Sequence, residues 1–418
     1  MSSHHEEDET DSSNAISDNE MVDQETGTKR VLSPQEEEEN LYHGQSEDDV
    51  ETLGSETKSL LMTMMGQLKI GMDLTKIPIP CDFLEPRSLL EKLTDFTTHC
   101  QILNNAMDFE DPEQRMLEVT RWYLSGWHVK PKGVKKPYNP VLGEIFRCNY
   151  FLPDGSVMTC AAEQVSHHPP ISALYCENQT KGLTVEGWYY PRSKFLGNSA
   201  ASIADGLVKI TFKERGEIYS CTWANIYARG VIFGKLIMEV GGKTSISCKK
   251  TGMSAEIDFK TKPMFGGEYN GVSAKIKKKG HTTHTISGKW NNVLTIKKRK
   301  MLGSGSNEEE FFNARTCKIM HKNVPLIQDQ LPNESRRLWV DLTAAINSNN
   351  VQAAAEEKNK VETSQRELRK VREDKCEVHK PVLFRQGPED FWTFIGHEHP
   401  FYVSLTNKDL SQLGKVAE

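Results

Sequence analysis

From Glu144 onward the sequence consists of short β-rich runs separated by turn residues, and this pattern limits the fold more than any other feature. About a dozen runs, from EIFRCNYF at Glu144 to VLTIKK at Val293, predict a long antiparallel meander. Side chains already fill closed barrels of about eight strands, so a barrel this large needs a ligand or a plug inside it. The predicted turns are Pro153-Asp154-Gly155, Arg215-Gly216, Arg229-Gly230, Gly241-Gly242 and Gly266-Gly267.

Helical patterns flank the meander on both sides. Residues 83–129 place apolar side chains three and four positions apart, and the sequence after residue 330 does the same. No repeat at a solenoid period interrupts this order. We therefore expect one α+β domain over residues 56–418, with a helical layer at 84–130, a barrel at 140–300 and a C-terminal helical region at 330–418.

Charge is distributed unevenly along the chain. Residues 1–58 hold 18 acidic and three basic side chains, whereas residues 59–418 hold 40 acidic and 49 basic ones. Because the N-terminal segment is so acidic and has few large apolar residues, it cannot bury enough apolar surface to offset the conformational entropy lost on folding. We therefore expect residues 1–55 to be a disordered tail. The mildly basic remainder suits an anionic partner such as a lipid phosphate and falls short of a nucleic-acid binder.

The sequence has neither the pattern of a secretory leader nor a run of about 18 apolar residues that could cross a bilayer. Its nine cysteines are scattered and include no C-x-x-C pair, which predicts reduced thiols instead of a disulfide framework or a zinc site. We expect a cytoplasmic protein.

Residues 58–72, KSLLMTMMGQLKIGM, form an apolar stretch that ends before Pro78 and Pro80. This composition predicts a short helix, because proline cannot continue one. The helix is either part of the core, which its periodicity favours, or a mobile cover over an apolar interior.

Two segments combine a restricted backbone with polar side chains. In KPYNPVLGE (Lys136–Glu144), two prolines restrict the backbone around Asn139, so Lys136 and Asn139 would be presented from a stiff loop. A structural corner between the helices and the barrel is the alternative interpretation.

The second segment, EQVSHHPP (Glu163–Pro170), lies between two predicted strands. Adjacent residues of a strand point to opposite faces and no third ligand follows at a suitable spacing, so a metal site here is disfavoured. A Ser166 nucleophile lacks the sequence of a strained elbow. His167 and His168 can instead donate several N–H groups to one anion, with solvated or core histidines as the alternative.

A third candidate element is a ridge on a late helix, formed by Lys358, Glu362 and Arg366 at a spacing of four residues. A narrow apolar stripe runs beside the ridge, so the three charges could line a mouth at the edge of the buried face. Charge pairing along the helix, from Glu362 to Arg366, is the alternative. Basic residues that we expect to be solvated follow at Arg369, Lys370 and Arg372.

The segment EEFFNA (Glu309–Ala314) has the acidic, double-phenylalanine appearance of motifs that dock on a receptor of the endoplasmic reticulum. It lies inside the folded part of the chain. Buried aromatic side chains at the end of the meander are therefore the favoured interpretation.

Together these motifs resemble the signatures of the oxysterol-binding protein family. EQVSHHPP resembles the fingerprint of that family, KPYNPVLGE its second signature, and the late helix its last element, in the correct order from about Leu60 to Arg372. The resemblance implies a large, incomplete antiparallel β-barrel around a lipid tunnel, closed by an N-terminal lid helix, and no enzymatic activity. The implied lid, at about residues 58–77, contains Leu60, Leu61, Met64, Met65, Leu68, Ile70 and Leu74.

The same resemblance implies that the tunnel entrance binds the headgroup of phosphatidylinositol 4-phosphate. It further implies exchange of that lipid for a second lipid between membranes, and leaves open whether the second is a sterol or phosphatidylserine. We expect a monomer that uses no cofactor, metal or nucleic acid. The implied headgroup residues are Lys136, Asn139, His167, His168, Lys358, Glu362 and Arg366.

Two other functional classes stay open from the sequence. A hydrolase would use Ser166 or the adjacent histidines as its reactive groups. A lipid sensor or scaffold would bind sterol or phosphoinositide without net transfer.

Overall fold

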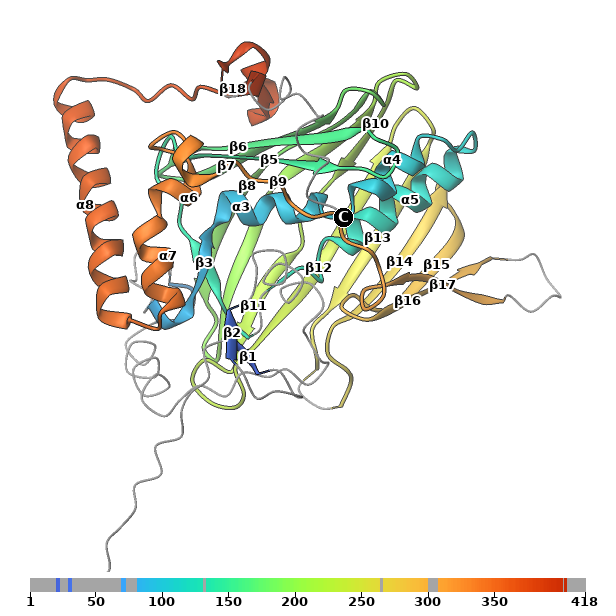
Figure 1. Cartoon of the computed structure of the whole chain (residues 1–418). Coiled ribbons are helices and arrows are strands. Elements are labelled where there is room, and N and C mark those ends of the chain that lie inside the picture. Colours follow the sequence, from blue (N-terminus) through green and yellow to red (C-terminus); the bar gives the residue numbers. More distant parts are fainter. Residues whose placement is uncertain are drawn as a thin grey trace, which may run out of the picture.

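A computed structural model gives the fold of the chain (Figure 1). It describes residues 20–22, 29–31, 69–72, 81–130, 133–263, 266–299, 307–400 and 402–403. None of the helices in these ranges combines the length and the apolar composition that a membrane span requires.

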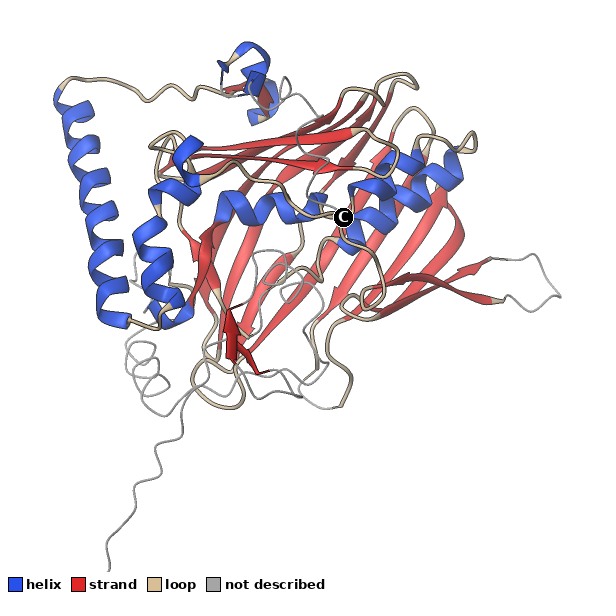
Figure 2. Ribbon diagram, in the orientation of Figure 1, coloured by secondary structure: helices blue, strands red, loops and turns tan. Residues whose placement is uncertain are grey.

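The largest unit is a strongly curved antiparallel sheet of 13 strands (Figure 2). Successive strands lie side by side from β5 at one edge to β17 at the other, and β11 pairs with both β9 and β12. Within the described residues no ladder joins β5 to β17, so the predicted meander and incomplete barrel are confirmed. The strands are β5 (Ile145–Phe151), β6 (Val157–His167), β7 (Pro170–Asn178), β8 (Leu183–Phe195), β9 (Ser199–Phe212), β10 (Glu217–Cys221), β11 (Asn225–Arg229), β12 (Ile237–Cys248), β13 (Met253–Lys260), β14 (Gly271–Lys278), β15 (His281–Lys289), β16 (Val293–Lys298) and β17 (Glu308–Asn313).

Helices α3 (Leu89–Leu93), α4 (Cys100–Ala106) and α5 (Pro112–Ser125) lie against this sheet (Figure 2). Helix α5 begins where the side chain of Asp111 accepts a hydrogen bond from the Glu113 N–H group at 3.0 Å. One core cluster contains side chains from both layers, among them Leu103, Met116, Trp122, Phe212 and Ile257. Side chains of these helices thus occupy part of the interior that a sheet of this size encloses.

Three C-terminal helices form a second layer: α6 (Ser335–Leu338), α7 (Val340–Asn347) and α8 (Val351–Asp374). Helices α7 and α8 lie side by side at the outer edge of the molecule (Figure 1). Ala354 and Val361 of α8 pack with Trp339, whereas Leu368 is 57% exposed. The apolar stripe of α8 is therefore buried only in its first half.

Short 3-10 helices connect these elements. They are η2 (Cys81–Phe83), η3 (Thr94–Thr97), η4 (Ile327–Asp329), η5 (Pro388–Asp390) and η6 (Gly396–Glu398).

Two segments expected to be helical form strands. Leu84–Ser88 becomes β3, which pairs in parallel with β4 (Lys136–Tyr138) and joins the first signature to the helical layer. The C-terminal region contains a hairpin of β18 (Phe384–Gln386) and β19 (Trp392–Phe394). Phe384 and Phe394 are buried there against Tyr175 of the main sheet, so tertiary packing determines the structure of this segment.

The predicted turn at Gly241-Gly242 lies inside strand β12. A side chain at Gly241 would place its Cβ atom 3.0 Å from the ring of Tyr227 on β11. Glycine therefore permits the close approach of β11 to β12 and does not end the strand here.

Cys160 and Cys176 lie opposite each other on β6 and β7 and are joined as a disulfide, with their Cα atoms 4.1 Å apart. The prediction that all nine cysteines are reduced is therefore wrong for this pair. Strand register brings the two residues together, which their spacing in the sequence does not reveal. The other cysteines are free: Cys81, Cys100, Cys148, Cys221, Cys248, Cys317 and Cys376.

The structure describes little of the chain before Cys81. Strands β1 (Glu20–Val22) and β2 (Lys29–Val31) pair within the segment that we expect to be disordered. Ile70 alone of the predicted lid side chains lies in the described part; it is 77% exposed in a turn whose Gly71 N–H group donates to the Phe195 carbonyl at 2.7 Å. The remaining lid residues lie outside the described ranges: Leu60, Leu61, Met64, Met65, Leu68 and Leu74.

Candidate functional site

The two signature segments lie side by side. The Gly143 N–H group donates to the Gln164 carbonyl at 3.0 Å, and the Gln164 N–H group donates to the Glu144 carbonyl at 2.9 Å. Gly143 has φ of +78°, and a Cβ atom there would lie 3.0 Å from Cε1 of His379. Glycine thus allows the loop after Lys136 to be fixed against the strand that carries the histidines.

Glu144, the last residue of the first signature, is a buried structural acceptor. Its carboxylate accepts hydrogen bonds from Ser88 Oγ at 2.5 Å, Ser335 Oγ at 2.7 Å and Trp339 Nε1 at 2.9 Å. The Val141 N–H group donates a further bond at 3.0 Å. Burial raises the pKa of Glu144, and these bonds oppose the rise. Through Glu144 the first signature therefore has a structural role, as a corner between the helices and the barrel.

Glu163, the first residue of the second signature, also binds backbone. Its carboxylate accepts hydrogen bonds from the N–H groups of Val382 at 2.9 Å and Leu383 at 2.8 Å. Burial raises the pKa of Glu163 to about 7. This residue connects β6 to the segment that leads into the C-terminal hairpin.

His167 and His168 follow at the end of β6, with their rings 4.7 Å apart in an edge-to-face arrangement. His167 Nδ1 lies 3.2 Å from the Pro140 carbonyl oxygen, and His168 is exposed. Burial lowers the pKa of His167 to about 4, and the nearby charges of His168 and Arg369 contribute. Neutral His167 donates its Nδ1 proton to Pro140, so its Nε2 atom needs a second proton before it can donate to an anion.

The positive charge of Lys358 acts on Lys136 of the first signature. Lys136 is an exposed residue by its overall surface. Desolvation in its surroundings nevertheless lowers its pKa, and the charge of Lys358 lowers it further. Like charges that act on each other in this way disfavour each other's charged form. An anion between them would relieve this repulsion.

The ridge on α8 makes intrahelical contacts, as in the alternative interpretation of its spacing. Glu362 lies 3.7 Å from Lys358 Nζ and 3.8 Å from Arg366 Nη2. Arg366 Nε donates to the Glu362 carbonyl at 3.1 Å, and the Arg366 side chain is 66% exposed. Lys358 is the ridge residue whose charge acts on the first signature, whereas Arg366 extends along its own helix.

Two further residues near the signatures were not among the candidates. Arg369, expected to be solvated, is close enough to His167 to lower its pKa. His379 lies against Gly143, and burial followed by the charge of Arg372 lowers the pKa of His379. Helical spacing places Arg369 beside the ridge, but only the packing of α8 against the signatures identifies its partner.

The geometry can be compared with known proteins. The sequence model of the oxysterol-binding protein family matches residues 63–402. The chain belongs to this family. The match continues past α8 through the hairpin of β18 and β19, farther than the sequence motifs alone indicate.

Curated members of the oxysterol-binding protein family align over most of the chain. Oxysterol-binding protein 4 of Dictyostelium discoideum is 42% identical over 372 residues, covering 88% of this chain and 80% of the relative. Human oxysterol-binding protein-related protein 5 is 39% identical over 393 residues, covering 92% of this chain but only 44% of the relative. The chain thus spans less than half the length of that human relative.

Solved structures of the family share the fold. The Osh1 ORD domain in complex with ergosterol superposes with a TM-score of 0.69 at 27% identity, covering 84% of this chain and 88% of that domain. The Osh3 ORD from Saccharomyces cerevisiae in complex with PI(4)P has a TM-score of 0.63 at 23% identity, covering 85% and 91%.

Proposed function

We propose that this protein is a lipid-transfer protein that exchanges a sterol or phosphatidylserine for phosphatidylinositol 4-phosphate between membranes, one lipid at a time. Membership of the oxysterol-binding protein family supports this proposal, as does the sterol bound to a related domain of the same fold. Residues 56–418 act as one monomeric lipid-binding domain that contacts membranes peripherally and carries out no chemical reaction.

The observation that carries the proposal is the group of cationic and titratable side chains around the two signatures. Lys136 lies on β4, whereas Lys358 and Arg369 both lie on α8, and each acts electrostatically on a neighbour in this group. A phosphorylated inositol is a dense anion, and its removal from water is tolerable only where charge-assisted donors replace the lost hydration.

The residues of the proposed headgroup site have different tasks. Lys136 and Lys358 provide point charges for the phosphate, and His167 provides a donor once it gains a proton. Glu362 cannot bind phosphate while it is ionised, so it accepts from an inositol hydroxyl or orients its basic neighbours. Asn139, His168 and Arg366, all exposed, complete the site.

The apolar part of either lipid requires only a dry interior, at about 0.8 kcal/mol for each methylene group removed from water. The lid at residues 58–77 would cover that interior. One interior can thus hold alternative lipids, while the headgroup site selects the phosphoinositide.

Mass spectrometry of lipids that co-purify with the full chain tests this assignment. We expect the double variant His167→Ala, His168→Ala to keep its sterol or phosphatidylserine and to lose phosphoinositide. His281→Ala is the matched control, because His281 is an exposed histidine on β15. Equal phosphoinositide in the wild type and the double variant would contradict the headgroup assignment.

A second measurement separates transfer from sensing. Fluorescent lipid is followed between donor vesicles that contain phosphatidylinositol 4-phosphate and acceptor vesicles that contain sterol or phosphatidylserine. The proposal predicts movement in both directions at catalytic amounts of protein. Loading of the protein without movement between vesicles would instead indicate a sensor or scaffold.

A further inference from the structure

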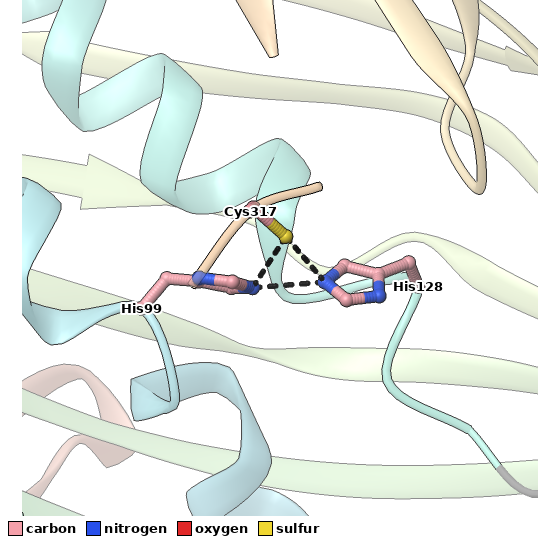
Figure 3. A group of neighbouring side chains, drawn as sticks. All are labelled: His99, His128 and Cys317. Atoms are coloured by element: carbon pink, nitrogen blue, oxygen red, sulfur yellow. Dashed lines mark hydrogen bonds between the residues drawn. The ribbon is translucent and has the colours of Figure 1, made fainter. Parts of the chain in front are cut away.

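Two histidines and one cysteine converge in the helical layer, away from the signature residues (Figure 3). The Nε2 atoms of His99 and His128 are 2.8 Å apart, and Cys317 Sγ lies 3.8 Å from each of them. His99 is fully buried, His128 is 5% exposed and Cys317 is partly buried. We propose that His99, His128 and Cys317 form a binding site for a late transition-metal ion, with Zn²⁺ as the expected occupant.

The interatomic distances are close to those of a coordinated ion. Tetrahedral Zn²⁺, with bonds of about 2.05 Å to nitrogen and 2.3 Å to sulfur, separates two nitrogen ligands by about 3.3 Å and nitrogen from sulfur by about 3.6 Å. Binding therefore requires the two imidazoles to move apart by about half an ångström and the thiol to move slightly inward. Small side-chain rotations suffice for both movements.

Two hydrogen bonds to backbone carbonyls hold the segment that carries Cys317 against the one that carries His99. The Met320 N–H group donates to the Thr98 carbonyl at 2.9 Å, and Gln101 Nε2 donates to the Lys318 carbonyl at 3.0 Å. Because Thr98 adjoins His99, these two contacts set the distance between the first and third ligands. The site is thus organised before an ion binds.

Apolar contacts organise the second histidine. Val129, which follows His128, packs against Ile319, two residues after Cys317. The ring of Phe312 lies 5.6 Å from the ring of His99 and 5.9 Å from that of His128. Phe312 therefore covers the cluster, and the predicted burial of the double-phenylalanine segment is confirmed, since both phenylalanines are buried.

The donor atoms select the class of metal. Two imidazole nitrogens and one thiolate suit borderline and soft ions, whereas Mg²⁺ and Ca²⁺ require oxygen ligands. On binding, the Cys317 thiol loses its proton to solvent as the sulfur–metal bond forms. The proton shared between the two Nε2 atoms moves to an Nδ1 atom, so both Nε2 lone pairs face the ion.

The site would connect three parts of the fold. His99 lies between η3 and α4, His128 follows α5, and Cys317 follows β17. A bound ion would fix the helical layer to the edge strand of the sheet. His99 and His128 are 29 positions apart in the sequence and Cys317 lies 189 positions after His128, so no ligand spacing is recognisable without the fold.

Metal binding is measured on the full chain after treatment with a chelator. We expect the wild type to take up about one equivalent of Zn²⁺ and to unfold at a higher temperature with the ion than without it. Substitution of Co²⁺ should give a thiolate-to-cobalt charge-transfer band. Cys317→Ser should abolish the band and weaken Zn²⁺ binding at least about a hundredfold, because it removes the thiolate ligand.

Matched variants distinguish this site from other thiols and histidines. Cys376→Ser removes an exposed thiol and should leave the cobalt band and the Zn²⁺ affinity unchanged. His128→Gln provides a second test that does not involve sulfur, with circular dichroism as the check that each variant is folded. Equal Zn²⁺ binding by the wild type and Cys317→Ser, or a wild type without a cobalt charge-transfer band, would overturn the proposal.

Discussion

The carboxylates and the cations of the two signatures occupy contrasting environments. Glu144 and Glu163 are buried and accept hydrogen bonds from three other segments of the chain. Burial lowers the pKa values of Lys136 and His167, and nearby positive charges lower them further. The same short motifs therefore contain residues that stabilise the fold and residues whose charges an anionic ligand would compensate. Variants of the two kinds should have separable effects.

The largest expected effect is a loss of stability in Glu144→Ala. This change removes the acceptor of the buried side chains of Ser88, Ser335 and Trp339 and of the partly buried Val141 N–H group. We expect the free energy of unfolding to fall by about 3 to 5 kcal/mol, measured by urea denaturation. Glu144→Gln keeps one acceptor oxygen and should lose less. A loss below about 1 kcal/mol in Glu144→Ala would show that the corner does not depend on this carboxylate.

The next effect is a pH dependence of stability caused by Glu163. Its folded pKa of about 7 exceeds the ordinary value of 4.5, so folding favours the protonated form. This contribution to stability is complete below about pH 4.5 and is lost as the pH rises to about 7, with an amplitude of about 1 to 3 kcal/mol.

Glu163→Gln should remove this contribution. The informative quantity is the difference in unfolding free energy between wild type and variant at each pH, because other carboxylates such as Asp95 have lowered pKa values and act in the opposite direction. A difference that does not change between pH 4.5 and pH 7 would contradict the assignment to Glu163.

A third effect concerns ligand binding and His167. The lipid-free pKa of this residue is about 4, and a bound phosphate should raise it, so binding takes up a proton. Affinity for vesicles containing phosphatidylinositol 4-phosphate should therefore increase as the pH falls, by at most about tenfold per pH unit. His167→Gln, measured on the same vesicles, corrects for titration of the lipid phosphate itself. Parallel pH profiles would exclude proton uptake by His167.

The smallest effects on stability are expected on α8. Arg366→Ala removes an exposed intrahelical pair and should change the unfolding free energy by about 0.5 kcal/mol or less, while phosphoinositide binding falls about tenfold.

Arg369→Ala should raise the pKa of His167 in a nuclear magnetic resonance titration, since the charge of Arg369 contributes to its lowering. Arg366→Ala is the matched control and should leave that pKa unchanged. If Arg366→Ala raised the pKa of His167 and Arg369→Ala did not, Arg366 would be the arginine that acts on His167.

Much of the fold could be predicted because strand and helix patterns are local. The alternation of apolar residues identifies the meander, and strands such as β13 keep that alternation in their burial. Local pattern failed where contacts between distant segments decide the structure. Gly241 appears as a turn until the approach of Tyr227 is known, and the C-terminal hairpin depends on Tyr175.

The residues of the candidate site could be proposed from the sequence, but their contacts could not. Composition and restricted backbone identify Lys136 and His167, but no spacing in the sequence shows that Lys358 and Arg369 act on them. The cluster of His99, His128 and Cys317 could not be predicted from the sequence at all, since its members share neither a motif nor a helix or strand. Such groups become visible only when three-dimensional packing is known.

The hydrogen bonds from Val382 and Leu383 to Glu163 have a consequence for the mobility of α8. Helix α8 ends at Asp374, so residues 375–381 form a tether between its basic end and an anchored backbone. Fully extended, seven residues reach about 25 Å. If α8 detached from α7, its C-terminal end would stay within this radius of the anchor, and the arginines near that end would therefore return to the histidines at a high effective concentration.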